Sequence, residues 1–219
     1  MSKMKLPRVY PILDSESLAM RGIALATAAR AMLEGGSGIL QIRHKGHWTR
    51  EVWQASREVA MLCREAGAML VVNDRADFAL LLEAGLHIGQ DDLPPRDARR
   101  LMSGDAVIGF SSHNPRQLAE AGGEPVDYVA LGPIFATASK RNPDPVVGIG
   151  ELARLRPMIE KPLVAIGGIT LENAGKVIGA GADSVAVIAG LLPPEVSART
   201  MRERMEEWLR VTAASRRVG

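Results

Sequence analysis

Three long polar side chains recur at every second position early in the chain. Gln41, Arg43 and Lys45 are separated by single residues. Because side chains of a strand alternate between its two faces, this spacing places all three on one face. Two cations and an amide donor suit an oxyanion such as diphosphate, which Arg clasps with two hydrogen bonds and Lys attracts as a point charge. The alternative is a solvated edge with incidental charges, because the Gly-His-Trp directly after it is typical of a short turn.

Carboxylates follow the next two apolar runs of the sequence. Asn73 and Asp74 end one run, and Asp91 and Asp92 follow the next. In a barrel of parallel strands these ends are neighbours, and facing carboxylates repel and shift each other's pKa. A divalent cation relieves this repulsion, and Mg²⁺ takes one or two carboxylates together with substrate phosphates. We therefore predict Asp74 and Asp92 as metal ligands and Asp91 as a helix N-cap, a common use of Asp after a strand.

Glycine-containing turns follow two later apolar runs. Gly167-Gly168 comes after one run, and Ile188, Ala189 and Gly190 come after the next. Exposed backbone N–H groups at these points can hold a phosphate, which commonly binds at the last two loops of a barrel. Either turn alone is equally typical of a tight connection. Their occurrence at successive strands indicates a second phosphate site.

A long stretch without periodicity spans residues 136–149. It contains Thr137, Ala138, Ser139 and Lys140. A loop of this length inside a compact domain is usually functional or mobile. Hydroxyl groups and an ammonium group suit a mobile segment that closes over phosphates. An ordinary solvated loop is the alternative interpretation.

The remaining candidates are single residues. Ser111, at the end of another apolar run, either donates to a phosphate oxygen or caps a turn. His87 lies inside a run, which predicts a buried, hydrogen-bonded histidine, and no spacing of histidines indicates a metal cluster. Cys63, the only cysteine, lies in an apolar helical stretch and is predicted to be a buried free thiol.

Eight short apolar runs supply the strands that must position these residues. They cover residues 9–13, 39–43, 70–73, 86–88, 107–111, 128–131, 163–166 and 185–188. Helical patterns lie between most of them, including one predicted as a single helix over 17–34. Alternating strands and helices predict an α/β protein, and eight such units close into a (β/α)₈ TIM barrel. An open doubly wound sheet is the alternative, although it usually has fewer strands at this length.

Composition narrows the class of protein. The 219 residues contain no Pro/Gly/Ser-rich linker, so we expect a single domain over 1–219. A net charge of only +2 argues against a nucleic-acid partner. No apolar run approaches the ~18 residues of a membrane span, and no signal peptide is apparent, so we expect a cytoplasmic protein without membrane contact. An exposed Trp48 or Trp53 would permit a homodimer.

Six motifs, taken together and in order, resemble those of the thiamine-phosphate synthase family. The resemblance covers about residues 10–191. The motifs are Gln41-Ile42-Arg43-His44-Lys45, Asn73-Asp74-Arg75, His87-Ile88-Gly89-Gln90-Asp91-Asp92, Leu131-Gly132-Pro133-Ile134-Phe135, Ala165-Ile166-Gly167-Gly168-Ile169 and Gly181-Ala182-Asp183. Each motif alone is weak, whereas the ordered set is specific.

The resemblance implies a barrel enzyme that joins two small phosphorylated substrates. One is 4-amino-2-methyl-5-hydroxymethylpyrimidine diphosphate, and the other is a thiazole ethyl phosphate or its carboxylated form. Thiamine phosphate and diphosphate are the products. The implied reaction is dissociative: diphosphate leaves first, the aminopyrimidine stabilises the cation, and the thiazole nitrogen captures it. Such a reaction requires no protein nucleophile, and the sequence shows no obvious Ser/His/Asp or Cys/His arrangement.

The same resemblance assigns roles to individual residues. The residues implied for the pyrimidine diphosphate are Gln41, Ile42, Arg43, His44, Lys45, Asn73, Ser111 and Lys140. Asp74 and Asp92 would bind Mg²⁺, and the thiazole phosphate would be held by Thr137, Ala138, Ser139, Gly168, Ile188 and Ala189. Arg43, Lys45 and Lys140 would act in catalysis by stabilising the leaving diphosphate.

Some positions depart from the family pattern, and other functions stay open. Leu13 replaces a usual Thr, Ser139 replaces a Thr, and Ala189 replaces a Ser and so lacks a side-chain donor. The nearest alternative is a thiazole tautomerase of the same superfamily. That branch lacks the Asn-Asp pair and the Asp-Asp pair that this chain has at 73–74 and 91–92, and it carries His where this chain has Pro133. Two further alternatives are a different phosphate-binding barrel, such as a sugar phosphate isomerase, and a non-catalytic sensor of thiamine precursors.

Overall fold

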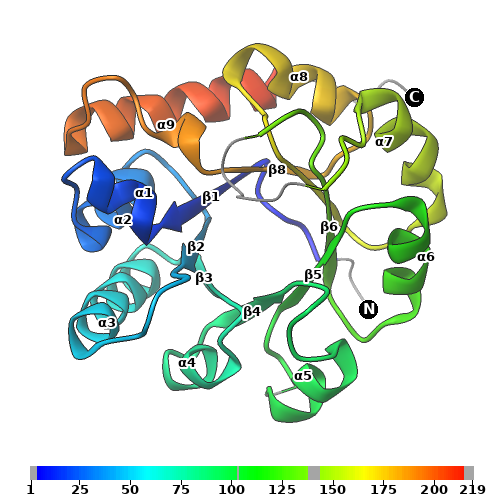
Figure 1. Ribbon diagram of the computed structural model, residues 1–219. Coiled ribbons are helices and arrows are strands. Elements are labelled where there is room, and N and C mark those ends of the chain that lie inside the picture. Colours follow the sequence, from blue (N-terminus) through cyan, green and yellow to red (C-terminus); the bar gives the residue numbers. More distant parts are fainter. Residues whose placement is uncertain (1–3, 103, 138–143, 215–219) are drawn as a thin grey trace.

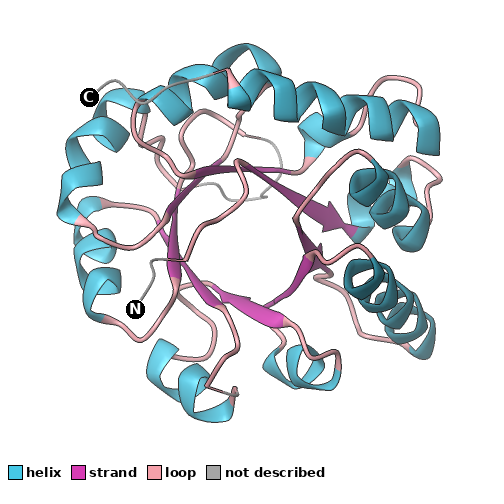
Figure 2. Ribbon diagram, turned by 180° about the vertical axis from the view of Figure 1, so that it is seen from behind, coloured by secondary structure: helices cyan, strands magenta, loops and turns pink. Residues whose placement is uncertain are grey.

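A closed barrel of parallel strands forms the centre of the protein. The computed structural model describes residues 4–102, 104–137 and 144–214 (Figure 1). The eight strands pair in sequence order and β8 pairs with β1, which closes the ring. The helices surround this ring on the outside, as the view from behind also shows (Figure 2). The predicted (β/α)₈ barrel is therefore confirmed, and the open sheet is excluded.

The strands are short, as the apolar runs predict. They are β1 Val9–Asp14, β2 Ile39–Arg43, β3 Met69–Asn73, β4 Gly85–Ile88, β5 Ile108–Ser112, β6 Tyr128–Leu131, β7 Leu163–Ile166 and β8 Ser184–Val187. The helices are α1 Ser15–Met20, α2 Leu25–Glu34, α3 Arg50–Glu65, α4 Ala76–Leu81, α5 Pro95–Leu101, α6 Pro115–Gly123, α7 Ile149–Leu155, α8 Leu171–Gly179 and α9 Ala198–Ala213. Two single-turn 3₁₀ helices, η1 Arg156–Met158 and η2 Ala189–Leu191, follow α7 and β8.

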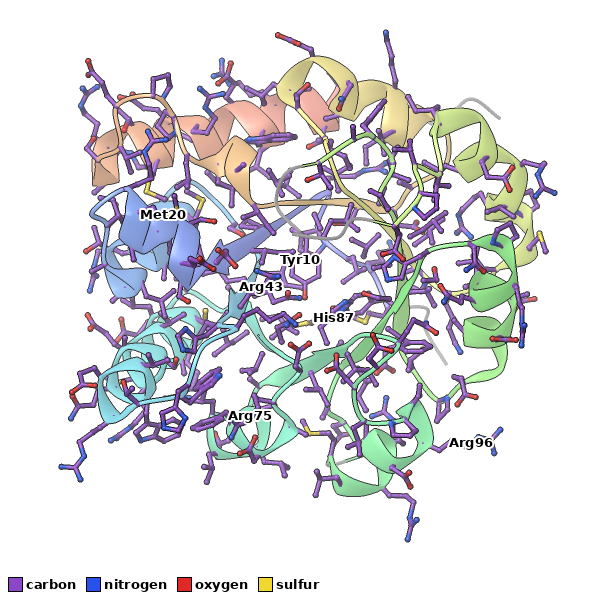
Figure 3. All side chains as sticks on the ribbon, in the orientation of Figure 1. Tyr10, Met20, Arg43, Arg75, His87 and Arg96 are labelled. Carbon is purple, nitrogen blue, oxygen red and sulfur yellow. The ribbon has the colours of Figure 1, made fainter. Side chains whose placement is uncertain are left out.

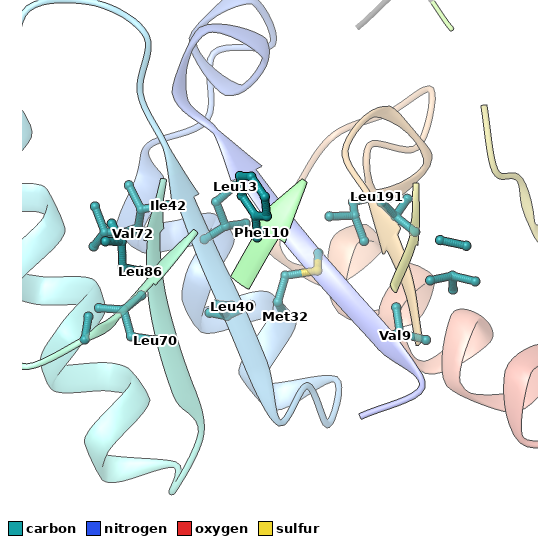
Figure 4. Close-up of a cluster of buried hydrophobic side chains, with 14 of the residues drawn as sticks. Val9, Leu13, Met32, Leu40, Ile42, Leu70, Val72, Leu86, Phe110 and Leu191 are labelled. Carbon is teal, nitrogen blue, oxygen red and sulfur yellow. The ribbon is translucent and has the colours of Figure 1, made fainter. Parts of the chain in front are cut away.

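Alternation along the strands produces two apolar layers. Outward-facing side chains, such as Leu40 and Ile42 of β2, meet the helices in the larger layer (Figure 4). Inward-facing ones, such as Tyr10, Ile39 and Tyr128, fill the inside of the barrel. Cys63 belongs to the outer layer with 1% exposure, so the prediction of a buried thiol is confirmed. Burial raises the pKa of this thiol to about 11.

The predicted helix over 17–34 is wrong in one respect, because the structure has two helices there. Gly22 has φ +68°, a left-handed conformation that ends a helix at little cost only for glycine. The amide of Ile23 donates to the Leu18 carbonyl at 3.1 Å, and that of Gly22 to the Ala19 carbonyl at 3.0 Å. These two bonds form a Schellman motif, which ends α1 and redirects the chain into α2.

Trp48, one of the two tryptophans whose exposure would permit a homodimer, is buried. Its ring stacks on Phe78 with centroids 4.1 Å apart, and only 8% of the residue is exposed. The Arg75 guanidinium lies 4.4 Å from the Phe78 ring centroid. Trp48 therefore offers no surface for a homodimer, whereas Trp53 is partly exposed. Among the helices of the described residues, none is long and apolar enough to span a membrane.

A close helix contact at the bottom of α2 gives a stability prediction. A Cβ at Gly35 would lie 2.7 Å from Cβ of Met205 and 2.9 Å from the Arg202 carbonyl oxygen, both on α9. We expect Gly35→Ala to lower the free energy of unfolding by about 1–3 kcal/mol, the typical cost of overpacking. Gly122→Ala is the matched control, since its Cβ would meet nothing within 4 Å. Denaturant unfolding measures both, and equal loss in the two variants would contradict the contact.

Candidate active site

The cavity that gathers the polar residues lies at the carboxyl ends of the strands. Its volume is about 980 Å³, and every strand contributes a lining residue except β6, which is followed directly by the lining residues Gly132 and Pro133. Parallel strands point their carboxyl ends to one side of the barrel, so residues distant in sequence meet there. Predicted site residues that line the cavity are Gln41, Arg43, Lys45, Asn73, Asp74, Asp92, Ser111, Thr137, Gly168, Ile188 and Ala189.

Two of the predicted side chains do not line this cavity. Ile42 is fully buried in the outer apolar layer. His44 faces Ser15, whose hydroxyl lies 2.7 Å from Nδ1, and its Nε2 lies 3.0 Å from the His47 carbonyl oxygen. The alternation that turns 41, 43 and 45 toward the cavity turns 42 and 44 away from it. Ala138, Ser139 and Lys140 lie outside the described residues.

Arg43 is held at the cavity by a carboxylate at the end of β1. Its guanidinium forms an ion pair with Asp14, which also accepts hydrogen bonds from the Ser17 amide at 2.9 Å and the Ser17 hydroxyl at 2.7 Å. Burial alone would raise the pKa of Asp14, but the Ser17 hydrogen bonds and the Arg43 charge together lower it. A charged Asp14 thus fixes Arg43, leaving its remaining donors for a ligand.

Two carboxylates and a lysine meet beside this arginine. Nζ of Lys45 lies 2.5 Å from Oδ2 of Asp74, and the Asp92 carboxylate accepts the Gly89 amide at 2.7 Å. Burial and the adjacent Asp74 carboxyl raise the pKa of Asp92, opposed by the Gly89 amide and Lys45. Asp74 has φ +64°, a conformation that is uncommon for a residue other than glycine and that gathers at functional sites.

This pair of carboxyl groups fits a hard divalent cation. Mg²⁺ prefers oxygen ligands and is usually held by one or two carboxylates, with waters and substrate phosphates completing its shell. Within the described part of the chain, no group of three His, Cys, Asp or Glu residues gathers for a metal. Two carboxylates could supply only part of the ligand shell of such a cation.

Asn73 presents a buried donor at the same end of the cavity. The residue is 7% exposed, and its Nδ2 has no hydrogen-bond partner among the described residues. A buried amide without a partner is costly, which favours a ligand acceptor at this position. Arg43, Lys45 and Asn73 thus provide cationic and amide donors at the ends of β2 and β3.

The opposite side of the cavity is built from backbone. Gly167 and Gly168 follow β7 with φ +98° and +63°. A Cβ at Gly168 would lie 2.4 Å from the Ala136 carbonyl oxygen. Only a glycine at 168 therefore allows the loop after β6 to pack this closely against the turn after β7. Backbone of Ile188 and Ala189 completes this side, where η2 begins.

Arg204 is a cation of the lining that sequence patterns did not reveal. It lies on α9 one turn before Trp208, whose indole Nε1 donates to the Gly190 carbonyl at 3.1 Å. Its guanidinium is only loosely paired with Glu207 at 3.7 Å, and its side chain is 28% exposed. In sequence it resembles the other arginines of a charged helix, and only the packing of α9 on η2 places it at the glycine side of the cavity.

Comparison with known proteins gives consistent matches. The model of a family described as thiamine monophosphate synthase matches residues 9–191. A thiamine-phosphate synthase of Koribacter versatilis is 46% identical over 96% of this chain and 98% of its own length. One of Laribacter hongkongensis is 41% identical over 93% and 96%. The solved thiamine phosphate pyrophosphorylase of Pyrococcus furiosus has a TM-score of 0.81 and 28% identity, and the match covers 97% of this chain and 98% of that one.

Proposed function

The chain belongs to the thiamine monophosphate synthase family, and from this premise we propose that its cavity joins a pyrimidine diphosphate to a thiazole phosphate. The pyrimidine is the 4-amino-2-methyl-5-hydroxymethyl form, and the thiazole carries an ethyl phosphate, with or without a carboxylate. The observation that carries the proposal is the chemical division of one cavity. Cations, carboxylates and Asn73 lie at one end, and glycine backbone and Arg204 lie at the other.

The first end suits the diphosphate. Arg43, oriented by Asp14, and Lys45, beside Asp74, present positive charge where the leaving group gains negative charge. Asp74 and Asp92 would hold Mg²⁺, which when bound supplies further charge to stabilise the leaving diphosphate. Asn73 offers a phosphate oxygen its Nδ2, which has no hydrogen-bond partner among the described residues. These groups bind and orient the diphosphate so that it departs along a fixed direction.

The coupling reaction needs no nucleophile from the protein. The bond between the pyrimidine methylene carbon and oxygen breaks, and diphosphate leaves with the electron pair. The aminopyrimidine ring delocalises the positive charge that remains. The thiazole nitrogen then donates its lone pair to that carbon and forms the new carbon–nitrogen bond. The chain's task is to hold both rings in a cavity of about 980 Å³ and to stabilise the departing charge.

The second end suits the thiazole phosphate. Backbone at Gly168, Ile188 and Ala189 can donate N–H groups to a phosphate, as helix starts in barrels commonly do. Ala189 supplies no side-chain donor there, and the loss of one hydrogen bond costs about 1 kcal/mol. Arg204 lies on the same side and would add a charged donor.

Arg204→Ala is expected to raise the KM for the thiazole phosphate roughly tenfold, the scale for a hydrogen bond to a charged group. The KM for the pyrimidine diphosphate is expected to stay the same, because its anion binds at the other end. Arg202→Ala is the matched control: it lies on the same helix and has a similarly loose pair, 3.8 Å from Glu206, but no part in the cavity lining. Equal thiazole phosphate KM values for the two variants would remove Arg204 from this site.

The function is tested by supplying the two rings separately and then together. Proton NMR follows the thiazole ring and the pyrimidine methylene group in the same sample. A synthase consumes neither ring alone and both together, whereas a tautomerase exchanges a thiazole proton with solvent when given the thiazole alone. Consumption of the carboxythiazole without the pyrimidine would contradict the proposal.

A further inference from the structure

An unbroken series of hydrogen bonds crosses the inside of the barrel and reaches the cavity at both ends. Nε2 of Gln41 lies 3.0 Å from the Tyr10 hydroxyl, which lies 2.8 Å from the Tyr128 hydroxyl. Tyr128 is 3.0 Å from Nδ1 of His87, and Nε2 of His87 is 2.9 Å from Oγ of Ser111. Tyr10 and His87 both point into the barrel (Figure 3). These five residues are hereafter the tyrosine–histidine chain, and they include both tyrosines of the protein.

One glycine permits this arrangement. Gly109 of β5 pairs with His87 of β4 on one side and with Tyr128 of β6 on the other. A Cβ at Gly109 would lie 2.0 Å from the Tyr128 ring, so any side chain there would displace the phenol. Because Gly109 has no side chain, the Tyr128 and His87 rings stack across β5, with centroids 5.6 Å apart. The strand order thus brings Tyr128 to Nδ1 of His87.

The hydrogens in the tyrosine–histidine chain run in one direction. Gln41 donates to Tyr10, and within the tyrosine–histidine chain the only acceptor left for the hydrogen of Tyr10 is the Tyr128 oxygen. Tyr128 then donates to Nδ1 of His87. A neutral ring with Nδ1 as acceptor carries its hydrogen on Nε2 and donates it to Oγ of Ser111. The hydroxyl hydrogen of Ser111 is then available to an acceptor in the cavity, which Ser111 lines.

A doubly protonated His87 does not fit this network. Both ring nitrogens would then donate, so Tyr128 would donate to Tyr10, which already accepts from Gln41. The hydrogen of Tyr10 would have no acceptor among these groups, although Tyr10 is only 1% exposed. Burial raises the pKa of both tyrosines, so both hydroxyl groups keep their hydrogens at neutral pH.

We propose that Tyr128 and His87 are positioning residues that hold Ser111 as a hydrogen-bond donor toward the pyrimidine diphosphate. The proposal rests on the proposed function for the identity of the ligand, an anionic oxygen acceptor. The other end of the tyrosine–histidine chain keeps Nε2 of Gln41 turned to Tyr10, which leaves the amide oxygen of Gln41 as its acceptor for a ligand. The hydrogen bonds inside the barrel therefore make Ser111 a donor and Gln41 an acceptor toward the cavity.

The first test reads the tautomer of His87 in the protein without substrates. Nitrogen NMR distinguishes a protonated ring nitrogen from an unprotonated one, and His87→Gln identifies the signals among the four histidines. We expect Nε2 to carry the hydrogen and Nδ1 to carry none at neutral pH. An Nε2 without a hydrogen would overturn the proposal, because Ser111 would then have to donate to His87. This readout needs no turnover, so it is independent of the proposed function.

The second test is a double-mutant cycle between Tyr128→Phe and Ser111→Ala, read as the affinity for the pyrimidine diphosphate by calorimetry. Tyr128 and Ser111 bond opposite nitrogens of His87, so coupling between them passes through that ring. We expect each single change to weaken binding roughly tenfold. Once Tyr128→Phe is present, we expect Ser111→Ala to cost no more than about twofold in addition.

Ser112→Ala is the matched control for this cycle. Ser112 is the next residue and is fully buried, but its hydroxyl donates to the Ala130 carbonyl at 2.8 Å and has no place in the tyrosine–histidine chain. Its effect is expected to be the same with or without Tyr128→Phe. Independent, multiplicative effects of Tyr128→Phe and Ser111→Ala would overturn the proposal, and so would equal coupling of Tyr128→Phe to Ser112→Ala.

Discussion

Arg43→Ala is expected to slow the coupling of the two rings by roughly two to three orders of magnitude, the scale for removal of one preorganised charged donor. The guanidinium lines the cavity and is fixed by Asp14, so it meets the developing charge without first being ordered. The measurement is kcat/KM for the pyrimidine diphosphate at saturating thiazole phosphate.

Arg57→Ala is the control for this loss of charge. Arg57 is an exposed residue of α3 outside the cavity lining, and its removal is expected to leave the rate unchanged. Turnover of Arg43→Ala within a few-fold of the unmodified protein would place Arg43 outside the active site. A rate loss of the same size in Arg57→Ala would mean that net charge, not position, matters.

Asp92→Asn is expected to raise the Mg²⁺ concentration needed for half-maximal activity by roughly tenfold or more, because an anionic ligand is replaced by a neutral amide. The fold should persist, since the amide oxygen of Asn can still accept the Gly89 N–H that Asp92 accepts at 2.7 Å. A Mg²⁺ titration of the steady-state rate measures the change, and circular dichroism checks the fold.

The neighbouring Asp91 is the matched control for the metal assignment. It is exposed and has the same chemistry one position away. Asp91→Asn is expected to leave the Mg²⁺ dependence unaltered. A shifted titration in Asp91→Asn together with an unchanged one in Asp92→Asn would reassign the ligand to Asp91. Activity that persists undiminished in EDTA would show that the reaction needs no metal ion.

Local sequence rules were sufficient for the strands and for the polar residues at their ends. The two-residue period predicted that Gln41, Arg43 and Lys45 share a face, and all three line the cavity. The parallel order predicted that Asp74 and Asp92 would meet. The same period argues against Ile42 and His44 as cavity side chains, although the family resemblance includes them.

Features that depend on packing between distant segments could not be predicted from sequence patterns. The break between α1 and α2 rests on one left-handed glycine, Gly22, in an otherwise helical pattern. Arg204 reaches the cavity only because α9 packs on η2. Tyr10 and Tyr128 are separated by 118 residues, and their hydrogen bond exists because the barrel closes around them. The periodicity of residues within one segment cannot predict a contact between two side chains so far apart in the sequence.

The most direct measurement is the yield of both products from the purified protein given both substrates and Mg²⁺. Chromatography quantifies thiamine phosphate and diphosphate in the same sample. We expect them to appear in equal amounts and only when both rings are present. Binding of both rings with neither product formed would contradict it, and would instead indicate a protein that senses thiamine precursors.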